Sequence, residues 1–178
     1  MKKILVVTLI LVLVLAGCSN GGDVKTGLGQ VISIAKSADA TAEKEGLAQV
    51  DTVMAAVTVD AKGVLKSVYI DTAQTKVNFT AEGVISTDKA AEQKTKKELG
   101  DDYGMKKQSS IGREWYEQIE ALEDWMEGKT IEQIKGMKTK VVNESHQNVP
   151  DEADLTSSVT VTVEDYIAAV EEAVKNAK

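Results

Sequence analysis

The sequence predicts a single α+β domain, in which an antiparallel sheet with a hairpin core is packed by several helices. Three observations support this prediction. Alternating, β-prone residues are concentrated in the first half of the chain, helix-like apolar spacing dominates the second half, and the chain closes with an amphipathic segment. Strands segregated from helices in this way are typical of α+β proteins.

The first residues carry an export signal. Lys2 and Lys3 precede an apolar run, Ile4–Leu15, which is too short for a spanning helix of about 20 residues. We therefore predict a cleaved signal peptide over residues 1–17. The closing Leu-Ala-Gly-Cys resembles the lipobox of bacterial lipoproteins, which implies that Cys18 is lipidated and anchors the protein to the cell membrane on its extracytoplasmic face. The Gly-rich residues 18–29 are predicted to be a membrane tether, and residues 30–178 the domain.

Composition excludes several kinds of chemistry. Cys18 and His146 are the single cysteine and histidine, so a disulfide, a thiolate metal site and a multi-histidine metal cluster are all excluded. We predict no catalytic residue and no metal site. Loss of Lys2 and Lys3 leaves 19 basic against 28 acidic residues, a formal net charge of −9. This charge argues against nucleic acid as a partner.

The strands are predicted from period-two alternation. Val50–Asp60 has the best strand pattern, Asp60-Ala61-Lys62-Gly63 has the residues of a tight turn closed by a left-handed glycine, and Val64–Asp71 returns as the second strand. Gln30–Lys36 is expected to add a third strand, because isolated hairpins are marginally stable. Gln74–Phe79 is a short further candidate.

The helices follow. Thr87 is expected to cap a polar helix over Asp88–Leu99, with Gly100 as its stop. A stronger helix is predicted over Ile111–Glu127, followed by a turn over Thr130–Gly136 that Thr130 caps. The apolar stripe of the stronger helix comprises Trp115, Ile119, Leu122 and Met126.

Two features allow a ligand site. Trp115, Tyr116 and Trp125 form either core packing or a wall for a flat ligand, and Tyr103 lies in a loop at a predicted pocket rim. A hydroxyl-rich run ending near Thr160 leads into the terminal helix, for which Thr162 and Asp165 suggest a capping box. This run is either an ordinary cap or a site for a phosphate-bearing cofactor at the helix N-terminus.

The stretch Asp154-Leu155-Thr156-Ser157-Ser158-Val159-Thr160 resembles the flavinylation motif of bacterial FMN-binding domains. These include extracellular electron-transfer flavoprotein lipoproteins of Gram-positive bacteria and the C subunit of the sodium-pumping NADH:quinone reductase. Asp154, Ser157, Ser158 and Thr160 match the motif, and Val159 departs from the expected alanine. The resemblance implies FMN joined through its phosphate to Thr160 by a flavin transferase, with Trp115 and Tyr103 as candidate contacts to the flavin ring.

The same resemblance implies an electron carrier and not an enzyme with its own substrate. Its expected partners are a membrane quinol-linked electron donor and an extracellular acceptor. The alternative is a cofactor-free lipoprotein that serves as an interaction or surface antigen module on the same fold.

Overall fold

The computed structural model describes residues 23–144 and 146–178, and its fold is α+β, as the sequence predicts. Residues 1–17 and Cys18, the predicted signal peptide and lipidation site, lie outside the described residues. The described elements, in chain order, are β1 (Val24–Ser33), β2 (Gly46–Asp60), β3 (Leu65–Phe79), α2 (Lys96–Leu99), the 3-10 helix η1 (Gly100–Tyr103), α3 (Trp115–Met126), α4 (Ile131–Lys135), β4 (Thr139–Lys140), β5 (Val149–Pro150) and α5 (Glu164–Asn176).

The main sheet is antiparallel and has the strand order β1-β2-β3. The predicted hairpin is confirmed, including its turn: Gly63 has φ 76°, and its N–H donates to the Asp60 carbonyl at 2.9 Å. Both strands are longer than predicted. β2 already begins at Gly46, and Gln74–Phe79 continues β3 instead of forming a separate strand.

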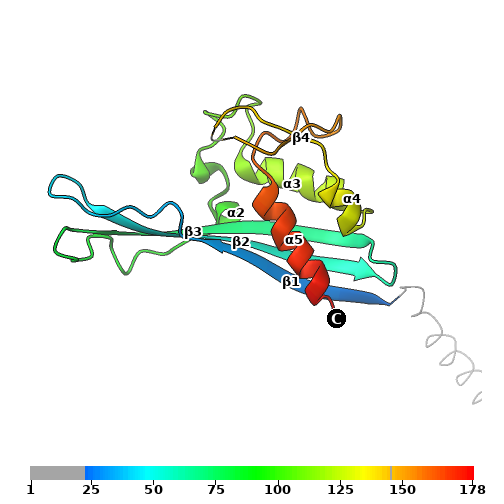
Figure 1. Ribbon diagram of the computed structural model, residues 1–178, viewed down its shortest axis with the longest axis horizontal. Helices are drawn as coiled ribbons and strands as arrows, with labels where there is room; N and C mark the ends of the chain where they lie inside the picture. The colour runs from blue at the N-terminus through cyan, green and yellow to red at the C-terminus, as the bar shows by residue number, and fades with distance from the viewer. Residues whose placement is uncertain (1–22, 145) are drawn as a thin grey trace, which may run out of the picture.

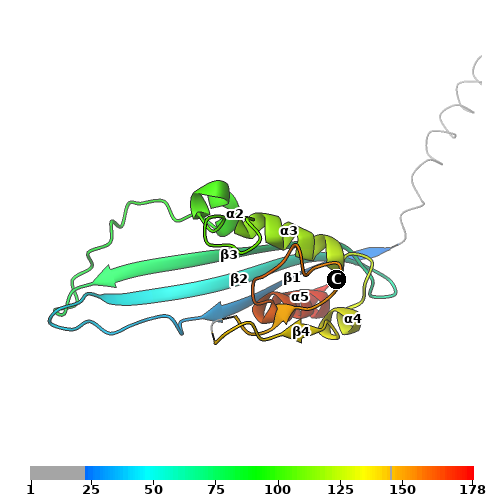
Figure 2. The same ribbon diagram turned by 90° about the horizontal axis from the view of Figure 1, so that it is seen from above.

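The four α-helices of the described residues lie on one side of the main sheet, and none of them lies on the opposite face (Figures 1 and 2). α5 packs across β1 and β2, and α3 packs against β3. The predicted stripe of α3 is confirmed, because all four of its members are buried in the core. Thr130 caps α4 with a reciprocal capping box, as expected.

The predicted tether over residues 18–29 is wrong from Val24 onward, where β1 begins. Gly27 and Gly29 belong to this strand and lie against α5. A Cβ atom on Gly29 would stand 2.1 Å from the carbonyl oxygen of Ala169, and one on Gly27 would stand 1.9 Å from that of Ala173. These glycines therefore serve close strand–helix packing and not chain flexibility.

Three helix starts also differ from prediction. α3 begins at Trp115 and not at Ile111. The helix expected over Asp88–Leu99 is confined to Lys96–Leu99 and capped by Thr95, while the Thr87 hydroxyl accepts a hydrogen bond from the Asn78 N–H at 2.7 Å. α5 begins at Glu164 with Val163 as its N-cap and no side-chain cap hydrogen bond, so the expected capping box at Thr162 is wrong.

Within the described ranges, no helix is long and apolar enough to cross a bilayer.

Candidate functional site

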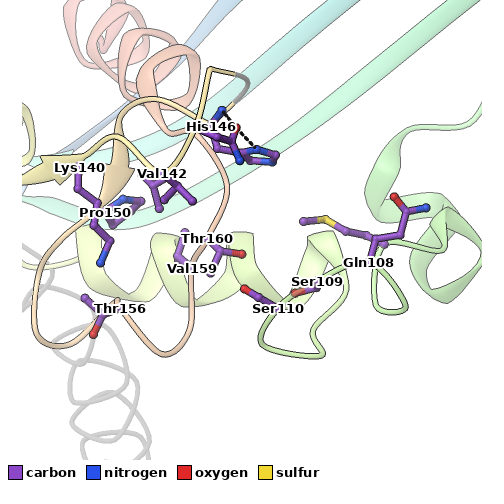
Figure 3. Close-up of a pocket in the computed structure, with 13 residues that line it drawn as sticks. Gln108, Ser109, Ser110, Lys140, Val142, His146, Pro150, Thr156, Val159 and Thr160 are labelled. Atoms are coloured by element: carbon purple, nitrogen blue, oxygen red, sulfur yellow. Dashed lines mark hydrogen bonds between the residues drawn. The ribbon is translucent and has the colours of Figure 1, made fainter.

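Thr160 lines a pocket of about 410 Å³ between three segments (Figure 3). One segment is the loop before α3, the second is the β4–β5 region, and the third is the turn that contains Thr160 itself. The residues that define these walls include Met105, Ser109, Ser110, Pro150, Val159 and Thr160. The volume is within the roughly 300–1,000 Å³ that small-molecule pockets occupy.

Thr160 is held by a buried amide on α3. Its N–H donates to Gln118 Oε1 at 2.9 Å, and its hydroxyl donates to the same oxygen at 3.2 Å. Gln118 is fully buried, and its amide N–H groups donate to Ser109 Oγ and to the Arg113 carbonyl, each at 3.3 Å. A single glutamine therefore fixes both the Thr160 turn and the loop opposite. The sequence gives no local signal of this role, since Gln118 and Thr160 are 42 residues apart.

The other residues that match the motif, Asp154, Ser157 and Ser158, do not converge on the pocket. Val159 and Leu155 are buried in the core, and the Val159 N–H donates to the Leu155 carbonyl at 2.8 Å. Asp154 and Ser157 are exposed, and neither they nor Ser158 lines the pocket. The branched side chain at position 159 thus has a packing role.

The helix-terminus hypothesis is not supported by the geometry. Thr160 lies four residues before α5, and its N–H is already bonded to Gln118. The first turn of α5 carries Glu164 and Asp165, whose negative charges oppose an added anion. What distinguishes Thr160 is its buried amide partner and its pocket.

A second pocket of about 320 Å³ adjoins the first, and Met105 and His146 line both. Consecutive residues of one segment separate them: Val159 and Thr160 line the first pocket, and Val161 and Thr162 the second. Other residues of the second pocket include Thr72, Lys96, Tyr103, Trp115 and Tyr166.

The candidate ring contacts Trp115 and Tyr103 both lie at this second pocket, whereas Tyr116 and Trp125 line neither pocket. Trp115 is 1 % exposed, and its indole N–H donates to the Tyr166 hydroxyl at 2.9 Å. The core-packing interpretation of Trp115 is therefore confirmed. Burial raises the pKa of Tyr166 to about 12, so its hydroxyl is protonated at neutral pH.

Lys96 is a functional candidate that sequence reasoning missed. Its ammonium lies 4.9 Å from the centre of the Tyr103 ring and 5.0 Å from that of Trp115. Burial, reinforced by the positive charge of Lys36, lowers the pKa of Lys96 to about 8. No pattern in the charged stretch around it separates Lys96 from the other lysines nearby.

His146 is exposed, as predicted, and its Nδ1 is 3.0 Å from Asn143 Oδ1. In the described part of the chain, no three His, Cys, Asp or Glu side chains gather in a way that could hold a metal ion.

Comparison with known proteins gives little overlap. No family model matches the chain, and no solved structure matches it. A chlorophenol reductase of Desulfitobacterium hafniense is 46 % identical over 41 residues, which are 23 % of this chain and 12 % of that protein. Because the similarity covers so little of either chain, it carries no activity over to this one.

Proposed function

We propose that this protein is a membrane-anchored flavoprotein that carries FMN on Thr160 through a phosphoester and takes part in electron transfer on the extracytoplasmic side of the membrane. One observation carries the proposal: the hydroxyl of the motif's final threonine lines a pocket and is positioned there by a buried amide. Bound FMN would supply the redox chemistry, and the protein would control its orientation and exposure.

The residues present fit such a group. Esterification would remove the proton that the Thr160 hydroxyl donates to Gln118, but the Thr160 N–H would still satisfy that oxygen. Ser109, Ser110 and Lys140 also line this pocket, and their side chains are donors suited to phosphate oxygens. The Lys140 ammonium, which lies 2.9 Å from Asp151, would share its charge between that carboxylate and the phosphate. The adjoining pocket, with the partly exposed Tyr103 on its wall, offers aromatic surface for the flavin ring.

The position of the pocket suits a lipid-anchored carrier. Thr26 near the start of β1 exchanges two backbone hydrogen bonds with Lys178, so the end of α5 lies beside the point where the chain enters the domain. Thr160 precedes the other end of this helix, which is about 20 Å long at 1.5 Å per residue. If Cys18 is the lipid anchor, the flavin would face away from the membrane, toward a flavin transferase and an extracellular acceptor. The membrane quinol-linked donor would then need a relay or a reorientation of the domain.

The alternative function, a cofactor-free interaction module, is favoured by a different observation. The sheet face without helices exposes large apolar side chains, with Leu28 63 %, Ile32 58 % and Tyr69 52 % exposed. Exposed apolar side chains on one face are often part of a binding surface for another protein.

Intact-mass measurement separates the two proposals. The full chain is co-expressed with a flavin transferase, and we expect an FMN adduct that is absent in Thr160→Val and retained in Thr160→Ser. Thr156→Val is the matched control, because Thr156 lines the same pocket but is exposed and has no bond to Gln118. An unmodified mass in the wild-type protein, with no yellow colour, would reject the flavoprotein and leave the interaction module.

A further inference from the structure

The second pocket contains the ammonium of Lys96, on which the charges of Asp51 and Asp71 act without a direct ion pair. Among the described residues, no Asp or Glu forms an ion pair with Lys96; its ammonium instead lies over the rings of Tyr103 and Trp115. Lysines that are withdrawn from water are normally paired with an anion. Its neighbour Lys97 follows that rule, with its ammonium 2.7 Å from Glu123. Lys96 therefore has capacity for a negative or electron-rich group.

The same pocket contains a polar atom without a partner. Thr72 is 4 % exposed, and its Oγ1 has no hydrogen-bond partner among the described residues. It lies close enough to Tyr166 to influence that phenol, but not in hydrogen-bond geometry. A buried hydroxyl without a partner is rare, and the residue that carries this one lines the pocket.

The remaining walls define the shape of that ligand. Aromatic and apolar side chains enclose the space, among them Val53, Tyr103, Met105, Trp115 and Val161. Two carboxylates also line the pocket: Asp51 is neutralised by Lys36 at 2.7 Å, and Asp165 is exposed. The positive charge of Lys96, which forms no direct ion pair among the described residues, thus lies beside aromatic and apolar side chains.

We infer that the second pocket binds a planar ring with a carboxylate or carbonyl edge, which the Lys96 ammonium and the Thr72 hydroxyl recognise. This chemistry has two sources, a free aromatic acid and the carbonyl edge of a flavin ring. The inference does not depend on attachment of FMN to Thr160, because both groups would bind a free ring equally well.

The test uses the full chain, expressed without a flavin transferase and titrated separately with benzoate and with lumiflavin, which has the flavin ring but no phosphate. The readout is the indole N–H signal of Trp115 in a nitrogen–proton NMR spectrum. Trp125 lines neither pocket and serves as the internal reference. We expect at least one probe to shift the Trp115 signal selectively. Binding of benzoate alone assigns the site to a free aromatic acid, and binding of lumiflavin alone assigns it to the flavin ring.

Two variants examine the recognising groups. Lys96→Met keeps the length of the side chain without its charge and should weaken binding about tenfold or more, since charge-assisted bonds are the stronger ones. Thr72→Val keeps the volume and should weaken binding about threefold or more. Lys94→Met is the control, because Lys94 lies two residues away and outside the pocket. The inference is overturned if neither probe shifts Trp115, or if Lys96→Met binds the probes as tightly as the wild-type protein does.

Discussion

The side-chain oxygen of Gln118 accepts two hydrogen bonds from Thr160, one from its N–H at 2.9 Å and one from its hydroxyl at 3.2 Å. This relationship connects the core of α3 to the turn that carries the candidate attachment residue. Because Gln118 is fully buried and its amide also reaches the loop opposite, the pocket wall is fixed by the core.

Gln118→Leu should therefore affect both stability and the site. The substitution leaves the Thr160 N–H without an acceptor and removes the donors to Ser109 and Arg113, at a cost of about 1–3 kcal/mol in the free energy of unfolding. Urea denaturation measures this loss. Gln108→Leu is the control, since Gln108 lines the same pocket but is exposed, and should change stability by less than about 0.5 kcal/mol. Equal stability of the two variants would contradict the anchoring role of Gln118.

A buried ion pair between Lys97 and Glu123 lies beside β3. Glu123 on α3 accepts hydrogen bonds from the Ile70 N–H and from the Lys97 ammonium, and the two charged side chains are 10 % and 13 % exposed. Burial raises the pKa of Glu123 in spite of the opposing effect of Lys97. Removing either partner should leave a charge that is costly to bury.

Lys97→Met is accordingly expected to lower the free energy of unfolding by about 3–5 kcal/mol at neutral pH. The double variant Lys97→Met/Glu123→Gln should recover part of this loss, because the amide oxygen of glutamine can still accept from the Ile70 N–H. Thermal or urea unfolding of both single variants and the double variant gives the coupling energy. Additive effects would mean that the pair contributes nothing as a unit.

The sequence predicted the parts of this fold that have a strong local pattern. The hairpin follows from alternation on both sides of a glycine turn, and α3 follows from its apolar stripe. The end of β3 was separated from its beginning because its polar residues mask the strand period. Residues 24–29 were misassigned because glycine is typical of linkers, and only contact with α5 shows why it is needed in β1.

The candidate site was predictable only where its residues form a local pattern in the sequence. Thr160 was found through a short contiguous motif, and the structure places its hydroxyl at a pocket. Asp154, Ser157 and Ser158 belong to that motif but not to the pocket wall. Gln118 and Lys96 come from segments distant in the sequence, and no spacing rule connects them to Thr160.

Tyr166 predicts a pH dependence. An unperturbed tyrosine has a pKa of 10.0, and burial raises that of Tyr166 to about 12 in the folded state. The folded protein therefore binds more protons than the unfolded chain between these values. The contribution of Tyr166 to the free energy of unfolding is therefore fully present below pH 10. It is lost as the pH rises through about 12, by about 2–3 kcal/mol in total.

Denaturant unfolding from pH 9 to pH 12 measures this loss as the difference between the wild-type protein and Tyr166→Phe. Tyr166→Phe should lack this part of the pH dependence. Below pH 10, its free energy of unfolding should be about 1 kcal/mol lower than that of the wild-type protein, because the Trp115 N–H loses its acceptor. Tyr69→Phe, at a position that is 52 % exposed, should retain most of the alkaline loss. Parallel pH profiles for the wild-type protein and Tyr166→Phe would contradict the prediction.

Gly29→Ala distinguishes a strand packed under α5 from a flexible tether. In the strand, the added Cβ would stand 2.1 Å from the Ala169 carbonyl oxygen and 2.3 Å from the Ala173 nitrogen, so α5 must move. We expect the free energy of unfolding to fall by about 3 kcal/mol, at the upper end of the usual cost of overpacking, and urea denaturation measures this change. Ala169→Gly should not rescue the variant, because the obstruction is backbone. Leu28→Ala, at the adjacent exposed position, should cost less than about 1 kcal/mol. A tether glycine would tolerate alanine without loss, so an unchanged unfolding midpoint for Gly29→Ala would mean that β1 is not packed against α5 in solution.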